Sequence, residues 1–141
     1  MTDVHSPEIR SYNMSRIRSK NTKPELLVRH FLYYSGLRYR VHHKGLPGKP
    51  DIVLPKYKTV VFINGCFWHG HEECKYFTMP KTRSEYWLNK IYNNINKDRK
   101  HVLTLEQIGW KVIVVWECDL KPNKAQITLS KLLKQIKSVR I

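Results

Sequence analysis

A long amphipathic segment, from about Ser84 to Ile108, separates three short apolar segments from a fourth. Apolar residues recur along it at the three- and four-residue spacing of a helix with one buried face. They are Leu88, Ile91, Ile95, Val102 and Leu105. The neighbouring segments have the composition of strands: Tyr39 to His42, Asp51 to Leu54 and Thr59 to Ile63 before it, and Val112 to Trp116 after it. This order indicates an α/β fold.

Two further helices are expected near the ends of the chain. Thr22 and Glu25 have capping-box spacing, Pro24 is tolerated in a first turn, and Gly36 can end the helix. A last amphipathic helix would bury Leu129, Leu132, Leu133, Ile136 and Val139. Helix, three strands, helix, strand and helix predict a sandwich around a mixed sheet of about four strands.

The length of 141 residues fits one domain with its own core. We expect residues 1–21 to form a basic arm, 22–120 the core and 121–141 a C-terminal helix. No apolar run reaches the roughly 20 residues of a membrane-spanning helix, and the N-terminus lacks a signal pattern. A membrane protein is therefore not expected, and neither is a repeat array. Three cysteines suit a reduced cytoplasmic protein rather than a disulfide scaffold.

The charge indicates a polyanionic partner. There are 26 Lys and Arg residues against 11 Asp and Glu, which gives a net charge of +15. Such an excess on a small protein attracts phosphate strongly. The alternative is a basic protein whose lysines only solvate it.

The irregular stretch from Asn64 to Pro80 contains candidate metal ligands. Cys66, His71 and Cys74 lie in it, and Cys118 follows the last strand. Three thiolates and an imidazole suit tetrahedral zinc, and four protein ligands would make that zinc structural. The alternative is three unrelated thiols and a surface histidine.

Two strand ends contain candidate hydrolytic residues. Asp51 begins one strand, and the next ends at Ile63 and Asn64. Mg²⁺ prefers oxygen ligands, so the Asp51 carboxylate and the Ile63 carbonyl could hold it. The second strand has neither the carboxylate nor the lysine that many metal-dependent nucleases place there. A base must therefore come from elsewhere, and His69 is the obvious candidate.

Two other carboxylates have two interpretations each. Asp98 lies in the apolar stripe of the long helix, where a carboxylate needs a partner. We pair it with His69, whose tautomer and basicity it would set; the alternative is a surface bond to a neighbouring Lys or Arg. Glu25 is either a capping residue or a carboxylate directed at the metal.

Aromatic residues in the irregular stretch are candidate DNA wedges. Phe67 and Trp68 belong to no regular core face, and such rings can unstack a base step. Trp87 could join them, and Met14 in the basic arm could approach from another side. Packing over the zinc site is the alternative.

These residues together resemble the very short patch repair (Vsr) DNA mismatch endonucleases. The resemblance extends from Met14 through Gly48 to Asp51 and onward to about residue 120. It rests on the run from Phe62 to His71, and then on Pro80, Thr82, Arg83, Tyr86, Trp87, Lys90, Ile91, Asn94, Asp98, Gly109, Trp110 and Val114 to Cys118.

The resemblance implies a restriction-endonuclease-like three-layer sandwich with a structural zinc. It implies Mg²⁺-dependent nicking of double-stranded DNA on the 5′ side of the thymine in a T:G mismatch, which arises when 5-methylcytosine deaminates. Asp51 and Ile63 would hold Mg²⁺, and His69, oriented by Asp98 and assisted by Glu25, would activate water. Zinc would be bound by Cys66, His71, Cys74 and Cys118, and Phe67, Trp68, Trp87 and Met14 would wedge into the DNA.

This sequence differs from the family pattern at two points. Asn64 stands where other members have a second active-site histidine, and the His71 to Cys74 segment is one residue longer. We expect a monomer at the bacterial nucleoid, with mismatch-repair proteins as partners. Two other functions fit the sequence: a zinc-stabilised DNA-binding module without catalysis, and a nicking endonuclease serving restriction.

Overall fold

The computed structural model describes residues 22–67, 69–71, 74–75 and 81–138. Its four strands form one sheet in the order β1-β2-β3-β4. The strands are β1 (Arg40–Val41), β2 (Ile52–Leu54), β3 (Thr59–Asn64) and β4 (Lys111–Trp116). The first two pairings are antiparallel, and β3 pairs with β4 in parallel. The predicted mixed sheet of four strands is confirmed.

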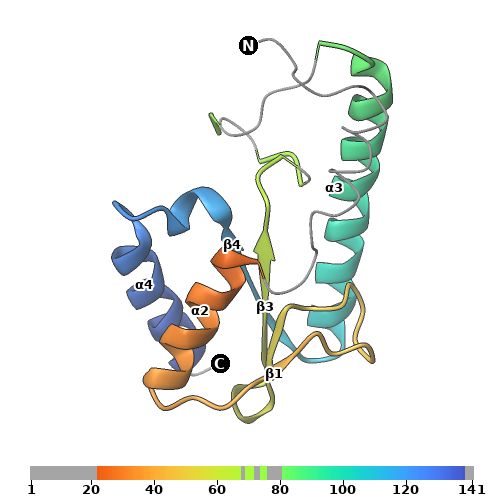
Figure 1. Cartoon of the computed structure of the whole chain (residues 1–141). Helices are drawn as coiled ribbons and strands as arrows, with labels where there is room; N and C mark the ends of the chain where they lie inside the picture. The colour runs from red at the N-terminus through yellow and green to blue at the C-terminus, as the bar shows by residue number, and fades with distance from the viewer. Residues whose placement is uncertain (1–21, 68, 72–73, 76–80, 139–141) are drawn as a thin grey trace.

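Helices cover both faces of the sheet, as Figure 1 shows. The helices α2 (Lys23–Tyr34) and α4 (Ala125–Lys137) lie on one face, and α3 (Ser84–Gln107) lies on the other. Two short 3-10 turns, η1 (Pro55–Tyr57) and η2 (Glu117–Leu120), follow β2 and β4. None of the helices described is both long and apolar enough to cross a membrane.

The alternation of side chains along the strands divides the core between the two faces. Ile52, Val61 and Ile113 point toward α2 and α4, where they pack with Val28, Leu32, Leu129, Leu132 and Ile136. On the opposite face, Val53 and Val60 pack against Leu105 of α3. The central strands β2 and β3 are therefore largely buried on both sides, which explains their nearly continuous apolar sequence, whereas Arg40 of β1 and Val114 of β4 are exposed.

Local signals set the ends of α2 as predicted. The Thr22 side chain accepts a hydrogen bond from the backbone N–H of Glu25, and Pro24 lies in the first turn. At the other end, Gly36 has a φ of +89°. The backbone N–H groups of Gly36 and Leu37 donate to the carbonyls of Tyr33 and Leu32, which closes the helix.

Two details differ from the sequence prediction. The first strand contains only Arg40–Val41, because His42 adopts a left-handed φ of +51° and leaves the extended conformation. On α3, Leu88 is 57% exposed, whereas Ile91 and Leu105 are buried. The first turns of α3 extend past the end of the sheet (Figure 1), so the apolar stripe is only partly covered there. The basic arm (1–21) and Val139 lie outside the described residues.

Candidate active site and metal centre

Asp51 lies beside β3 at the point where β2 begins. Its carboxylate accepts a hydrogen bond from the backbone N–H of Ile63, with 2.6 Å between Oδ2 and N. The first residue of β2 is Ile52, so the Asp51 side chain satisfies a donor that the strand ladder no longer reaches. The carbonyl of a strand residue points to the same side as its N–H, so the Ile63 carbonyl lies on the Asp51 edge of β3.

The Asp51 carboxyl lies in surroundings that oppose its ionisation. Burial raises its pKa from 3.8 to about 6, while the Ile63 hydrogen bond lowers it. Among the nearby charges, Glu25 raises the pKa, and His42 and His69 lower it. Glu25, His42 and His69 therefore each act electrostatically on Asp51, although they lie at separate places in the sequence.

Glu25 takes part in the helix cap through its backbone, and its side chain is a buried carboxylate. Its backbone N–H donates to the Thr22 hydroxyl oxygen at 3.4 Å, as a capping residue would. Its side chain is only 1% exposed, and Oε2 lies 2.8 Å from Nε2 of His42 and 3.1 Å from a guanidinium nitrogen of Arg29. The helix start thus places a buried carboxylate near Asp51.

His69 and Asp98 form the pair that the sequence predicted. His69 Nδ1 lies 2.6 Å from Asp98 Oδ2, and both side chains are about one-third exposed. An ionised carboxylate can only accept a hydrogen bond, so Nδ1 carries the proton and Nε2 presents its lone pair. Asp98 thus bonds His69 in the structure, and this contact is not the alternative surface bond to a neighbouring Lys or Arg.

A compact turn fixes His69 between two candidate metal ligands. The backbone N–H groups of His69 and His71 donate to the carbonyls of Gly65 and Cys66, at 3.2 and 2.9 Å. Between them, Gly70 has a φ of +60°, and a Cβ there would lie 2.7 Å from a side-chain carbon of Ile95. Only glycine fits this approach to α3, so the turn is held closely against the helix that contributes Asp98.

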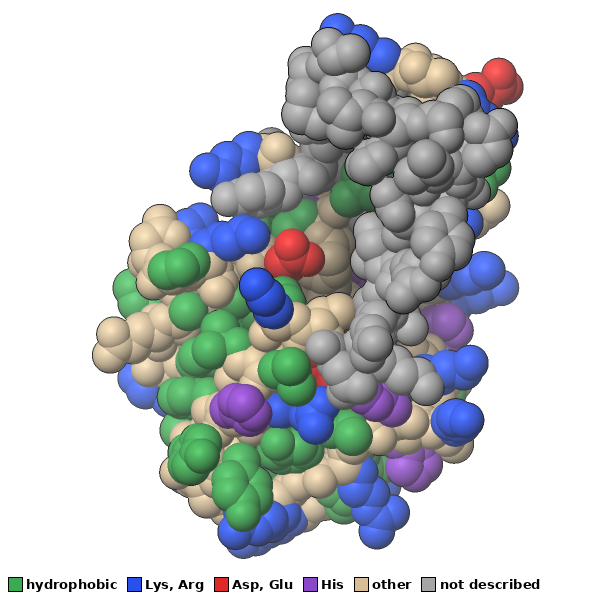
Figure 2. All heavy atoms as spheres, viewed as in Figure 1, with side chains coloured by type: hydrophobic (Ala, Val, Ile, Leu, Met, Phe, Trp, Pro, Cys, Tyr) green, Lys and Arg blue, Asp and Glu red, His purple; other side chains and the backbone are tan. Residues whose placement is uncertain are grey.

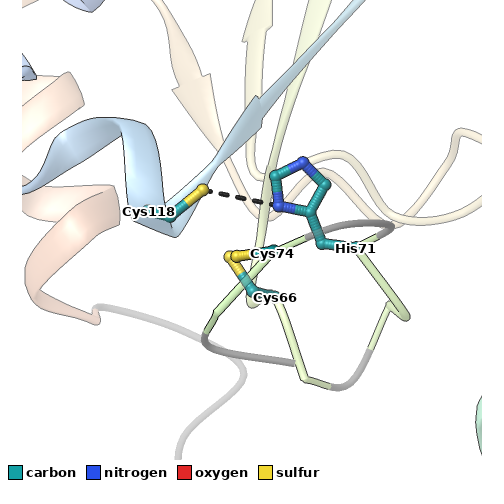
Figure 3. Close-up of side chains that lie close together, drawn as sticks. All are labelled: Cys66, His71, Cys74 and Cys118. Atoms are coloured by element: carbon teal, nitrogen blue, oxygen red, sulfur yellow. Dashed lines mark hydrogen bonds between the residues drawn. The ribbon is translucent and has the colours of Figure 1, made fainter. Parts of the chain in front are cut away.

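The four predicted zinc ligands converge. The ligand atoms of Cys66, His71, Cys74 and Cys118 all lie within 4.8 Å of one another. Figure 3 shows three of these side chains coming from the loop after β3, with Cys118 coming from η2 after β4. Cys118 Sγ lies 3.4 Å from Nδ1 of His71. Cys74, three positions after His71, therefore belongs to the cluster.

The chemistry of this cluster fits a thiolate-binding metal. Ligand atoms in a tetrahedral zinc site lie roughly 3.3–3.8 Å apart, so a small contraction would complete the shell. Burial raises the pKa of Cys66 to about 12 and also raises the pKa of Cys118. These thiols stay protonated in the metal-free protein at neutral pH, and a bound metal would have to displace their protons.

The Trp116 ring lies between the cluster and His69. It stacks on His71 with ring centroids 4.0 Å apart and an angle of 4° between the planes. It meets His69 edge-on at 6.5 Å. Sequence analysis gave Trp116 no role at the site, and its position at the end of an apolar strand gave no signal of one.

The structure brings together two of the four predicted DNA wedges. Phe67 and Trp87 form an edge-to-face pair with ring centroids 5.6 Å apart, and Tyr86 packs against Trp87 at 5.1 Å. Trp68 and Met14 lie outside the described residues. Figure 2 shows far more Lys and Arg than Asp and Glu side chains on this face of the molecule, which suits a phosphate backbone.

Comparison with known proteins identifies the family. A model described as "DNA mismatch endonuclease Vsr" matches residues 2–75. A protein from Neisseria meningitidis named "Type II nicking enzyme V.NmeAIP" is 54% identical over 139 residues, which cover 97% of this chain and 98% of that protein. The chain belongs to the Vsr family. Vsr proteins are DNA endonucleases, so the predicted enzyme class is confirmed.

Two further matches support the family and the fold. The Escherichia coli protein named "DNA mismatch endonuclease Vsr" is 44% identical over 121 residues, which cover 86% of this chain and 77% of that protein. The catalytic domain of the homing endonuclease I-Bth0305I has a TM-score of 0.57 at 21% identity, covering 84% of this chain and all of that domain. This likeness concerns the fold, and it confirms the predicted restriction-endonuclease-like class for this Vsr chain.

Removal of one cluster ligand should abolish metal loading. We expect elemental analysis to find one zinc per chain in the wild type and less than ~0.2 in Cys118→Ser. The melting temperature of the variant should fall by roughly 10 °C, because metal binding contributes directly to folding. Wild-type protein without zinc, or a variant with unchanged zinc, would contradict the ligand set.

The raised pKa of Asp51 predicts a pH-dependent stability effect. The folded protein binds this proton more tightly than the unfolded chain, so the contribution is full below pH 3.8 and is lost as the pH rises through about 6. In Mg²⁺-free buffer, Asp51→Asn should therefore raise the melting temperature at pH 7.5 by about 3–6 °C. The difference should shrink at pH 5. A variant that melts below the wild type at pH 7.5 would contradict this account.

Proposed function

We propose that this DNA endonuclease nicks duplex DNA on the 5′ side of the thymine in a T:G mismatch, by Mg²⁺-dependent hydrolysis. The observation that supports hydrolysis best is the His69–Asp98 pair, 2.6 Å apart, close enough to Asp51 for His69 to lower its pKa. An oriented base beside a buried carboxylate is the arrangement that phosphodiester hydrolysis needs. The family name and the E. coli relative support mismatched DNA as the substrate.

The residues around Asp51 fit a divalent cation. The Asp51 carboxyl is half-buried, and repulsion from the negative charge of Glu25 raises its pKa. A cation held by the Asp51 carboxylate and the Ile63 carbonyl would relieve that repulsion. Mg²⁺ bound there would polarise the phosphoryl group and stabilise the leaving oxygen. Below pH 6, protonation of Asp51 would compete with the cation.

The other steps belong to side chains of the protein. His69 accepts a proton from the attacking water at Nε2, while Asp98 keeps the proton on Nδ1 and the ring in place. Glu25 assists from the start of α2. The products are a 3′-hydroxyl and a 5′-phosphate.

Mismatch preference follows from the aromatic residues. The Phe67–Trp87 pair, together with Trp68 and with Met14 of the basic arm, would wedge into the duplex. A T:G step is easier to unstack than a matched step, so an aromatic wedge discriminates between them through deformation energy. Zinc in the cysteine–histidine cluster would hold the loop that contains Phe67 and Trp68 to η2.

One nicked strand needs one active site, so we propose a monomer that works on chromosomal DNA beside mismatch-repair proteins.

A second function is a nicking endonuclease associated with restriction. The 54% identical relative named a type II nicking enzyme favours it. The two functions share the chemistry and differ in whether cleavage depends on the mismatch. A DNA-binding module without catalysis would give no nick under any condition.

The discriminating experiment is a nicking assay on matched and T:G duplexes in several flanking sequences. We expect Mg²⁺-dependent cleavage of the thymine strand, at least about 100-fold faster on the T:G duplex than on its matched control. Equal rates would remove the mismatch assignment and favour the restriction-associated function. No nicks with Mg²⁺ would favour the binding module.

Orientation of His69 by Asp98 predicts a specific kinetic effect. Asp98→Asn preserves the shape of the side chain but no longer favours the reactive tautomer, so kcat should fall by roughly 10²-fold or more while DNA affinity is unchanged. His69→Ala should abolish cleavage and leave binding largely intact. A matched control is Glu106→Gln, which makes the same carboxylate-to-amide change at an exposed position of α3. Near-normal nicking by His69→Ala would show that the base is elsewhere.

A further inference from the structure

His42 contacts both Glu25, which is buried, and Asp51, which is half-buried, yet the proposed chemistry gives it no task. Its ring nitrogen Nε2 lies 2.8 Å from Oε2 of Glu25. Its backbone N–H donates to the backbone carbonyl of Asp51 at 3.2 Å. One residue therefore joins the segment that contains Asp51 to the helix that contains Glu25.

The backbone of His42 is in an unfavourable conformation. Its φ of +51° lies in the left-handed region, which is strained for a residue with a Cβ. This conformation ends β1 and turns the side chain out of the strand pattern toward α2. Such strain persists only where the surrounding contacts hold it, and it occurs often at functional sites.

The Glu25 carboxylate depends on donors from two directions. Arg29 lies one turn along the same helix and contacts Oε2 at 3.1 Å. His42 contacts the same oxygen from outside the helix. A carboxylate that is only 1% exposed needs hydrogen-bond donors, and both Arg29 and His42 contact its Oε2. The contact with His42 links this carboxylate to the segment that contains Asp51, because the His42 backbone N–H donates to the Asp51 carbonyl.

We infer that His42 is a positioning residue that holds the Glu25 carboxylate toward Asp51 and thereby sets the affinity of the site for a divalent cation. The inference rests on the proposed function, because it assumes a cation between Asp51 and Ile63. It assigns His42 no contact with substrate. The relevant chemistry is the N–H donor of the ring, so a glutamine amide should replace it.

The test measures Mn²⁺ binding to the zinc-containing protein by electron paramagnetic resonance, without DNA. We expect His42→Ala to weaken Mn²⁺ binding about tenfold. His42→Gln, which keeps a donor, should stay within about threefold of the wild type. His42→Gly relieves the backbone strain but removes the donor, so it should bind Mn²⁺ as weakly as His42→Ala. His30 is an exposed histidine on α2, the helix that contains Glu25, and His30→Ala should behave as wild type.

A purely structural role for His42 would give a different pattern. In that case His42→Gly would recover both stability and Mn²⁺ affinity, which would overturn the inference. So would wild-type affinity in His42→Ala, or a His42→Gln variant no better than His42→Ala. In nicking assays, His42→Ala should need about tenfold more Mg²⁺, with kcat at saturating Mg²⁺ nearly unchanged.

Two controls separate failure of this inference from failure of the proposed function. If the wild type binds Mn²⁺ and Asp51→Ala abolishes binding, the cation site stands, and His42→Ala alone decides the inference. If the wild type binds no Mn²⁺, or Asp51→Ala binds it normally, the proposed cation site and the inference are both wrong.

Discussion

The parallel pairing of β3 with β4 brings the site together. Asn64 pairs with Trp116 at the last step of that ladder, so both strands end at the same edge of the sheet. The chain leaving β3 supplies Cys66, His69 and His71, and the chain leaving β4 supplies Cys118. A parallel pair needs a crossover connection, and the crossover here is α3, which contributes Asp98. One pairing thus determines where the base, its carboxylate partner and the metal ligands meet.

The fold was largely predictable because its signals are local. Capping at Thr22, the helical period of α3 and the short apolar strands each depend on neighbours in sequence, and the structure agrees with them to within one or two residues at most ends. The position of Asp98 in an apolar stripe indicated that it needs a partner, but the sequence left both His69 and a neighbouring Lys or Arg open, and the structure shows His69. The four cluster ligands could be predicted because three cysteines and a histidine are the residue types that bind zinc.

The residues that were missed depend on tertiary geometry. The left-handed conformation of His42 follows from contacts with α2 and Asp51, and nothing in the adjacent sequence requires it. The stacking of Trp116 on His71 arises only once β4 lies beside β3. Conversely, Leu88 fitted the helical period but remained exposed, since periodicity predicts a face and cannot say how far the sheet extends beneath it.

The turn from Gly65 to His71 has a consequence for how this protein can change over evolution. Cys66 and His71 belong to the metal cluster, and His69 between them meets Asp98. Adding or deleting a residue in this turn would shift the imidazole and the metal ligands together. Insertions and deletions there should therefore not be tolerated. The spacing after His71 is different, because no residue of the candidate catalytic pair lies between His71 and Cys74, so a change of length there would leave His69 in place. Natural variation in loop length should therefore collect on that side of the histidine.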